Sequence, residues 1–261
     1  MQKNEVKNKY GMAHAILPME YENYVFDLYG TLVDIHTEED RFQLWEKLCF
    51  FYGFYGAVYT PEEMQKAYRE LVDSKQANLK LELETDANYV HEASPEIELT
   101  DVFEELFLQK GIKVQKELAI HAGQFFRILS MEYVRVYEGT HEMLQILKNA
   151  GKKLYVLSNA QRIFTAHEMR LLDIEKYFDG ILISSDYKTK KPDKRFFDIL
   201  LEAYPMDVKK TLFVGNDSKT DIAGAKTVGF DTFYVKSNIS PQGDFAETAH
   251  YAVDNFVGWK V

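Results

Sequence analysis

The sequence predicts an α/β fold, in which a Rossmann-like parallel sheet core carries an inserted α-helical cap. From Tyr137 onward, helix-like segments alternate strictly with short apolar runs. Such alternation is typical of a parallel sheet covered by helices on both faces. One further apolar run lies near the N-terminus, and about a hundred residues with helical signals only separate it from the others. This spacing favours a helical insertion after the first strand.

Residues 1–19 are expected to form a flexible extension. They contain lysines but no uninterrupted apolar stretch of the roughly seven residues that a secretory signal requires. We therefore expect the core to comprise residues 20–34 and 137–261, and the cap to comprise residues 35–136.

The first core strand is expected in the run YVFDLYGTLVD, which begins at Tyr24. The run is apolar and β-favouring, stops at Asp27 and continues into a glycine turn. A buried strand here would deliver Asp27 to its carboxyl end.

The inserted segment carries helix signals. Residues 60–63 form a capping box with Pro61 at the first helical position, and apolar side chains repeat at helical spacing from Leu118 to Tyr133. The most apolar stretch, Leu48 to Tyr59, is far shorter than the roughly 20 residues that span a bilayer. It indicates buried helix and turn or, alternatively, a dimer contact, so both a monomer and a homodimer are compatible with the sequence.

The remaining strands are expected in the runs KLYVLSN, GILISSD, TLFVGND and FDTFYVK. Three of the five predicted strands end in reactive or phosphate-friendly residues: Asp27, then Ser158 with Asn159, then Asn216 with Asp217. Ligands in open parallel sheets bind at the carboxyl ends of the strands. The sequence therefore predicts one site to which these residues converge.

The composition restricts the partners of the protein. The formal net charge of -10 argues against nucleic acid and against an anionic membrane, because both require a positive surface. A single cysteine, Cys49, excludes an intramolecular disulfide and favours a cytoplasmic protein. The seven histidines include no pair at zinc-ligand spacing. The expected partner is a small metabolite.

Four short motifs resemble those of the haloacid dehalogenase superfamily, which contains phosphatases, phosphomutases, phosphonatases and dehalogenases. One DxxxT pattern alone is weak, but four motifs in order, each at a predicted strand end or in the following loop, are specific. They are Asp27-Leu28-Tyr29-Gly30-Thr31, Ser158, Lys191-Pro192, and Gly215-Asn216-Asp217 through Asp221. The resemblance extends from about Glu20 to the end of the chain and implies a hydrolase with a cap on the N-terminal side.

Asp27 is the candidate nucleophile. Its carboxylate can attack phosphorus and form an aspartyl-phosphate that water then hydrolyses. A carboxylate that approaches a phosphate dianion is repelled unless a cation lies between them, and Mg²⁺ suits a cluster of oxygen ligands. We expect Mg²⁺ to be held by the Asp27 side chain, the Tyr29 carbonyl oxygen and an oxygen of Asn216 or Asp217, with Asp217 preferred for its charge.

Asp221 and Lys191 complete the candidate charged group. Asp221 is expected beside the metal or holding Lys191, and the alternative is a carboxylate that interacts with a helix dipole. Lys191 can neutralise charge on both the nucleophile and the transferring phosphoryl group, which makes it a catalytic and a phosphate-binding candidate. The other phosphate-binding candidates are Ser158, Asn159 and Thr31, since Ser158 and Asn159 at a helix entry can donate to phosphate oxygens. A purely structural hydroxyl explains Thr31 almost as well.

Tyr29 departs from the pattern of the phosphatases. In the phosphatases of this superfamily, which the chain resembles, an aspartate usually lies two residues after the nucleophile and acts as general acid and base. A phenol with a pKa near 10 is poorly matched to that task at neutral pH. Tyrosine at this position is instead typical of the 2-haloacid dehalogenase branch, which acts without a metal.

Three features argue against the dehalogenase alternative. Those enzymes lack paired acids in the fourth motif, whereas this chain has Asp217 and Asp221. They carry a tyrosine six residues after the third-motif lysine, where this chain has Phe197. They also bind the substrate carboxylate with an arginine early in the cap, and no arginine occurs between Arg41 and Arg69.

The sequence thus favours a magnesium-dependent hydrolase of a small phosphorylated metabolite. The alternatives are a metal-independent 2-haloacid dehalogenase and a weakly active phospho-ligand-binding module. Good leaving groups, such as acyl or aryl phosphates, or a cap residue such as His36 or Glu39, would compensate for the missing acid. Hinges at residues 34–37 and 137–139 would let the cap close, and cap side chains are expected to select the substrate.

Overall fold

The computed structural model describes residues 6–7, 13–85, 95–245 and 248–260. Its centre is a six-stranded parallel sheet with the order β10-β9-β8-β3-β6-β7. The strands are β3 (Asn23–Phe26), β6 (Lys153–Ser158), β7 (Gly180–Ile183), β8 (Thr211–Gly215), β9 (Asp231–Val235) and β10 (Tyr251–Val253). The predicted fold class is confirmed, and five of the six strands coincide with the predicted runs.

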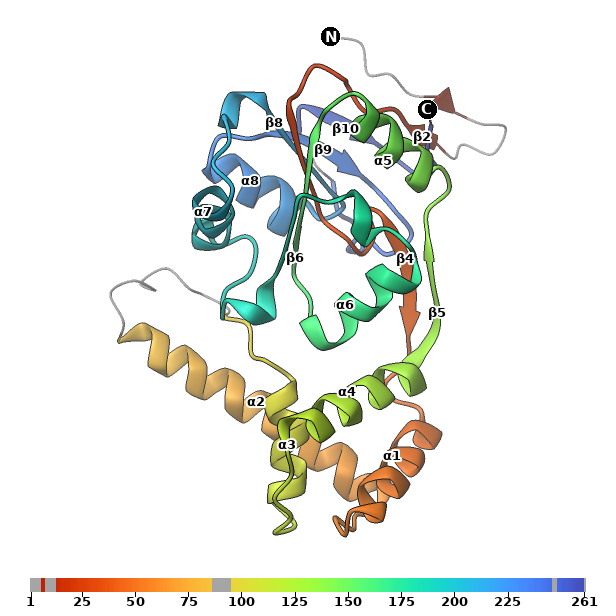
Figure 1. The fold of residues 1–261 in the computed structure, drawn as a ribbon, viewed down its shortest axis with the longest axis vertical. Coiled ribbons are helices and arrows are strands. Elements are labelled where there is room, and N and C mark those ends of the chain that lie inside the picture. Colours follow the sequence, from red (N-terminus) through yellow and green to blue (C-terminus); the bar gives the residue numbers. More distant parts are fainter. Residues whose placement is uncertain (1–5, 8–12, 86–94, 246–247, 261) are drawn as a thin grey trace.

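Helices cover both faces of this sheet, with α5 and α6 on one side and α7 and α8 on the other (Figure 1). The central strand β3 explains why, because successive side chains of a strand point to opposite faces. Val25 packs in a buried cluster with Phe196, whereas Tyr24 and Phe26 pack in a second cluster with Leu144. The helices are α5 (Thr140–Asn149), α6 (Arg162–Leu171), α7 (Lys194–Ala203) and α8 (Ala223–Thr227), with short helical turns η2 (Glu175–Tyr177), η3 (Ser184–Asp186), η4 (Val208–Lys210) and η5 (Ser218–Ile222).

Four further helices, here called the cap helices, form the end of the molecule opposite the two termini (Figure 1). They are α1 (Phe42–Phe54), α2 (Pro61–Glu84), α3 (Thr100–Leu108) and α4 (Lys116–Ser130). They enclose an apolar core of their own, in which Trp45, Tyr68, Phe103 and Phe126 contact one another. The predicted capping box starts α2, where the Thr60 side chain accepts a hydrogen bond from the next turn.

Two antiparallel strands, β4 (Val33–Thr37) and β5 (Met131–Val136), connect the sheet to the cap helices. The helix expected to reach Tyr133 ends instead at Ser130, because Tyr133 pairs with His36 across this ribbon. Asp34 is buried at its base and forms an ion pair with Arg135, with an N–O distance of 2.7 Å. The segment expected as one hinge is therefore a paired strand.

Part of the N-terminal segment differs from the expected flexible extension. The structure contains β1 (Val6–Lys7) and β2 (Ala13–Ala15), and β2 pairs in parallel with β11 (Phe256–Trp259) near the C-terminus. Ala13, Ala15 and Leu17 are buried in the cluster on one face of the central sheet. Residues 1–5 and 8–12 of the expected extension lie outside the described residues. The partner strand lies at the other end of the chain, so local sequence carried no sign of this pairing.

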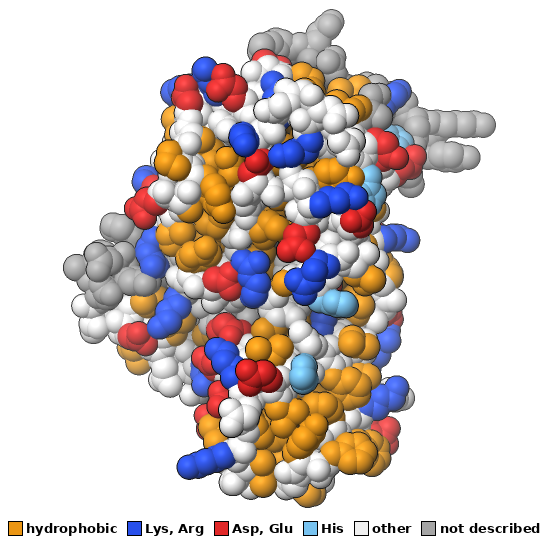
Figure 2. All heavy atoms as spheres, in the orientation of Figure 1, with side chains coloured by type: hydrophobic (Ala, Val, Ile, Leu, Met, Phe, Trp, Pro, Cys, Tyr) orange, Lys and Arg blue, Asp and Glu red, His pale blue; other side chains and the backbone are white. Residues whose placement is uncertain are grey.

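The stretch from Leu48 to Tyr59 has two environments. Tyr52 and Ala57 are buried, as expected for helix and turn, whereas Phe50, Phe54 and Val58 are 67%, 87% and 69% exposed. Hydrophobic side chains accordingly gather at the cap end of the molecule (Figure 2). Among the helices of the described ranges, none has the length and apolar character needed to cross a membrane.

Candidate active site

A cleft of about 240 Å³ brings together the candidate residues that follow β3, β6 and β8. Every residue predicted as nucleophile, metal ligand or phosphate-binding group lines it except Thr31, which is buried beside it and donates a hydrogen bond to Asn216 at 3.4 Å. The lining residues are Asp27, Tyr29, Ser158, Asn159, Lys191, Asn216, Asp217, Thr220, Asp221, Ile239 and Pro241.

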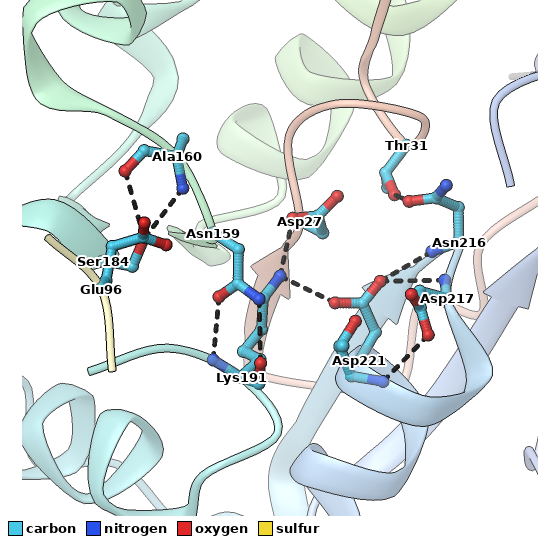
Figure 3. A network of polar contacts seen from close by, with 11 residues as sticks. Asp27, Thr31, Glu96, Asn159, Ala160, Ser184, Lys191, Asn216, Asp217 and Asp221 are labelled. Carbon is cyan, nitrogen blue, oxygen red and sulfur yellow. Dashed lines mark hydrogen bonds and ion pairs between the residues drawn. The ribbon is translucent and has the colours of Figure 1, made fainter. Parts of the chain in front are cut away.

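Lys191 lies between the carboxylates of Asp27 and Asp221 (Figure 3). Its Nζ is 2.6 Å from Asp27 Oδ1 and 2.7 Å from Asp221 Oδ1, and its side chain is only 1% exposed. Burial by itself would lower the pKa of Lys191, but the charges of Asp221 and Asp27 raise it above its usual value. Lys191 is therefore a cation at neutral pH.

Burial raises the pKa of Asp221 to about 7; Lys191 opposes this shift and Asp27 adds to it. One oxygen of the Asp221 carboxylate forms an ion pair, and the other accepts hydrogen bonds. Oδ1 faces Lys191, while Oδ2 accepts hydrogen bonds from the backbone N–H groups of Asn216 and Asp217 at 3.0 Å each. Asp221 thus fixes both the lysine and the loop after β8.

Asp27, Tyr29 and Asn216 direct oxygen-bearing groups toward one point. One end of the Asn216 side-chain amide lies 3.0 Å from the Tyr29 carbonyl oxygen and 3.3 Å from Asp27 Oδ2. The amide nitrogen at that end would donate to both oxygens, whereas the amide oxygen there would complete a set of three oxygens. The two loops approach closely because of Gly30, since a Cβ atom at Gly30 would lie 2.2 Å from Asn216.

Asp217 also lines the cleft, but one of its carboxylate oxygens has its partners in the following helical turn. Its Oδ1 accepts hydrogen bonds from the N–H groups of Lys219 and Thr220, at 2.8 and 2.9 Å, and thereby caps the helical turn η5. This is the geometry of an N-cap, in which a side-chain oxygen satisfies free donors of the first turn.

The polar residues after β6 differ in how fully they are bonded. Asn159 uses both ends of its amide on the backbone of Lys191, at 2.8 and 2.9 Å, and so holds the lysine-bearing loop in place. Ser158 is buried, and its hydroxyl has no hydrogen-bond partner among the described residues. A buried hydroxyl without a partner is costly, and one that lines a cleft is available to a ligand.

The chain also matches a known protein family. The model of the haloacid dehalogenase-like hydrolase family matches residues 24–235. The chain belongs to this family. The family prediction is confirmed, and the protein is an enzyme of the hydrolase class.

Individual relatives are distant. A glyceraldehyde 3-phosphate phosphatase of Pyrococcus abyssi is 25% identical over 177 residues, which cover 67% of each chain. A phosphorylated carbohydrates phosphatase of Thermotoga maritima is 24% identical and covers 82% of this chain and 84% of its own. An (S)-2-haloacid dehalogenase of Burkholderia cepacia is also 24% identical, over 87% and 88% of the two chains.

Among solved structures, a haloacid dehalogenase-like phosphatase from Thermococcus onnurineus shares the fold with a TM-score of 0.52 at 18% identity. The match covers 90% of this chain and 94% of that one.

The side chain of Tyr29 takes an unexpected direction in this haloacid dehalogenase-like hydrolase. Its hydroxyl donates a hydrogen bond to Glu168 on α6 and contacts Thr165 Oγ1 at 3.2 Å. Burial raises the pKa of the Tyr29 phenol, and the charge of Glu168 raises it further while Arg127 opposes the shift. The phenol is therefore an even weaker acid than free tyrosine.

Four residues around the site lacked a sequence signal. Ile239 and Pro241, in the loop after β9, are apolar residues that line the cleft. Glu168 accepts the hydrogen bond of the Tyr29 hydroxyl, and Arg127 forms an ion pair with Glu168. Neither His36 nor Glu39 lines the cleft, and His36 instead lies 3.5 Å from Glu132 on the connecting ribbon. None of the lining residues belongs to the cap helices in the part of the chain that the structure describes.

Proposed function

We propose that this haloacid dehalogenase-like hydrolase is a magnesium-dependent phosphatase that cleaves small phosphorylated metabolites through an aspartyl-phosphate on Asp27. The main support is the convergence, in one cleft, of the Asp27 carboxylate, the Lys191 cation and the oxygen-bearing groups of Tyr29 and Asn216. Relatives that are named as phosphatases of phosphorylated sugars support the same substrate class.

The residues present fit a magnesium ion. Asp27 Oδ2, the Tyr29 carbonyl oxygen and the Asn216 amide oxygen would hold it, a hard-oxygen set that Mg²⁺ prefers. Asn216 fits this role better than Asp217, whose Oδ1 accepts two backbone hydrogen bonds as an N-cap. Asp221, whose two oxygens are both engaged, would orient Lys191 and the Asn216 loop rather than bind the ion. When bound, the ion would reduce the repulsion between the nucleophile and the phosphate and polarise the phosphoryl group.

The chain's own residues would carry the covalent steps. An Asp27 oxygen attacks phosphorus, the bond to the leaving oxygen breaks, and the leaving group departs with the bonding electrons. Lys191, held by Asp221, offsets the charge that builds up on the phosphoryl oxygens. Ser158, whose hydroxyl lacks a partner, donates to one of those oxygens. Water then attacks the aspartyl-phosphate and releases phosphate and free Asp27.

Protonation of the leaving group is the step for which the cleft offers no strong acid. The Tyr29 hydroxyl donates its hydrogen bond to Glu168, and the pKa of the phenol is raised. Substrates whose leaving groups are stable as anions, such as acyl and aryl phosphates, suit such a site. A series of aryl phosphates tests this: kcat/KM should fall steeply as the leaving-group pKa rises, and a flat dependence would contradict it.

A turnover panel tests the proposed function. Phosphate monoesters, an acyl phosphate and 2-haloacids are each offered with Mg²⁺ and with EDTA. We expect phosphate release that EDTA and Asp27→Asn both abolish. Halide release that is insensitive to EDTA would instead select a dehalogenase, the alternative favoured by Tyr29 and by the Burkholderia cepacia relative. Tight Mg²⁺-dependent binding of a phosphorylated ligand without turnover would select a binding module.

Two further expectations accompany this proposal. The single cysteine favours the cytoplasm, where a small phosphorylated metabolite is available. Monomer and homodimer are distinguished by sedimentation equilibrium, with attention to the exposed face of α1 that carries Phe50 and Phe54.

A further inference from the structure

Glu168 is a buried carboxylate that the proposed reaction does not use. It lies on α6, is 2% exposed and does not line the cleft. A charge buried this deeply is tolerated only where it has ionic or hydrogen-bonding partners. The partners that Glu168 has come from two different parts of the molecule.

The first partner is a cap helix. Arg127 on α4 donates from Nε to Glu168 Oε1 at 2.6 Å and from Nη2 to Oε2 at 3.3 Å. The same guanidinium lies over the rings of Phe164, at 5.1 Å, and Tyr29, at 5.9 Å. A forked arginine–carboxylate pair of this kind has a defined geometry, so it fixes where α4 docks on α6.

The second partner is the loop of the nucleophile. The Tyr29 hydroxyl donates to Glu168 Oε2, the oxygen that Arg127 Nη2 also contacts. The carbonyl oxygen of the same tyrosine lies 3.0 Å from the Asn216 amide. One residue, two positions after Asp27, therefore joins the buried carboxylate to the oxygen cluster of the cleft.

We propose that Glu168 and Arg127 are positioning residues, which couple the docking of the cap helices to the geometry of the nucleophile loop, residues 27–33. With α4 docked, Arg127 neutralises Glu168, Glu168 anchors the Tyr29 side chain, and the Tyr29 carbonyl is held toward Asn216. When α4 moves away, Glu168 loses its counter-ion and becomes a solvated, mobile anchor. The nucleophile loop then loosens, and the proposed metal ligands separate. In this respect the inference rests on the proposed function.

Hydrogen–deuterium exchange of the metal-free protein tests the coupling directly. Inside the loop, the Gly30 N–H donates to the Val33 carbonyl at 2.8 Å and the Val33 N–H donates to the Leu28 carbonyl at 2.9 Å. Exchange at these amides reports loosening of the loop. We expect faster exchange in Glu168→Ala and Arg127→Met, and a smaller change in Glu168→Gln, which keeps an acceptor for Tyr29.

The matched control is Glu82→Ala. Glu82 on α2 forms an exposed ion pair with Lys188 of the core at 3.5 Å, so its loss also removes a contact between cap and core but does not touch Tyr29. Loop exchange should match the wild type in this variant. Unchanged exchange in both Glu168→Ala and Arg127→Met, or an equal increase in Glu82→Ala, would overturn the proposal. If Glu168→Ala does not fold, Arg127→Met and Tyr29→Phe carry the test, since each leaves Glu168 one partner.

Calorimetric titration with Mg²⁺ supplies the second readout. Arg127→Met and Tyr29→Phe should each weaken Mg²⁺ binding by about tenfold, the scale seen when groups behind metal ligands are removed. Both substitutions act through Glu168, so the Mg²⁺ affinity of the double variant should be no lower than that of the single variant with the lower affinity. If the two fold-losses in affinity multiply in the double variant, the two residues do not act through Glu168 together. If the wild type binds no Mg²⁺ and releases no phosphate, the proposed function fails, whereas the exchange experiment still decides the coupling.

Discussion

Replacement of Lys191 by methionine would remove the cation that lies between Asp27 and Asp221. Methionine is also unbranched and roughly preserves the volume, so the change isolates the charge. Two carboxylates would then remain in a site where Asp221 is fully buried and Asp27 nearly so. We expect a folded but markedly less stable protein without phosphatase activity.

The distances give the size of the effect. With N–O separations of 2.6 and 2.7 Å, each pair attracts by about 6 kcal/mol at an effective dielectric constant of about 20. Desolvation offsets much of this, and breaking a buried pair typically costs about 3–5 kcal/mol in unfolding free energy. In a chain of this length, such a loss lowers Tm by about 10 °C. Urea denaturation in EDTA at pH 8 measures the change in unfolding free energy.

The loss should depend on pH in a defined direction. The pKa of Asp221 is raised above its unfolded value, so its contribution to stability is complete at low pH and is lost as pH rises through about 7. Without Lys191 the pKa rises further, since the nearby cation that lowers it is gone. The difference between variant and wild type should therefore be largest at pH 8 and should shrink toward pH 5.

Lys194→Met is the matched control, because Lys194 forms an exposed i,i+4 pair with Asp198 on α7. It should cost about 0.5 kcal/mol or less. A Lys191→Met loss below about 1 kcal/mol, or one that does not change between pH 5 and pH 8, would refute the electrostatic reasoning.

Four more substitutions separate the roles of the site residues. Asp27→Asn should abolish phosphate release without lowering Tm, because Lys191 keeps Asp221 as its partner; residual turnover at the wild-type rate would exclude Asp27 as the nucleophile. Asn216→Ala should weaken Mg²⁺ binding about tenfold or more, as measured by calorimetry. Asp217→Ala should mainly lower the unfolding free energy by about 1 kcal/mol through loss of the N-cap, as measured by urea denaturation. The reverse pattern would make Asp217 the metal ligand. Ser158→Ala should raise KM for the substrate while leaving the unfolding free energy unchanged or up to about 1 kcal/mol higher, because the hydroxyl loses no bond; a destabilised variant with unchanged KM would contradict its assignment to the phosphate.

The parallel sheet was accessible from sequence because its main strands carry strong local signals. β3, β6, β7, β8 and β9 are apolar runs, each followed by a turn or a helix, so hydrophobic pattern alone located them. β2 and β10 are shorter, with three residues each. Their strand conformation depends on partners, such as the pairing of Ala15 with Trp259, that lie far away along the chain. The connecting ribbon of β4 and β5 was also missed. Its strands are about a hundred residues apart in the sequence, and a helical pattern continued to Tyr133.

The site shows a similar division. Strand ends converge at one edge of a parallel sheet, so the sequence determined that Asp27, Ser158 and Asn216 would meet, together with Lys191 from the third motif. It could not decide between Asn216 and Asp217. Neighbouring side chains point in different directions, and only the backbone path after β8 turns one toward Asp27 and the other back onto its own helical turn.

Sequence by itself determined the fold class, the family and the candidate residues that converge on the cleft, because these follow from local pattern and strand order. Tertiary structure alone decided what happens to Tyr29. Its partners, Glu168 and Arg127, lie 139 and about 100 residues away along the chain, and each reads locally as an ordinary polar residue of an amphipathic helix. Their ion pair exists only because α4 docks on α6, and docking is a property of packed surfaces rather than of any segment of the chain.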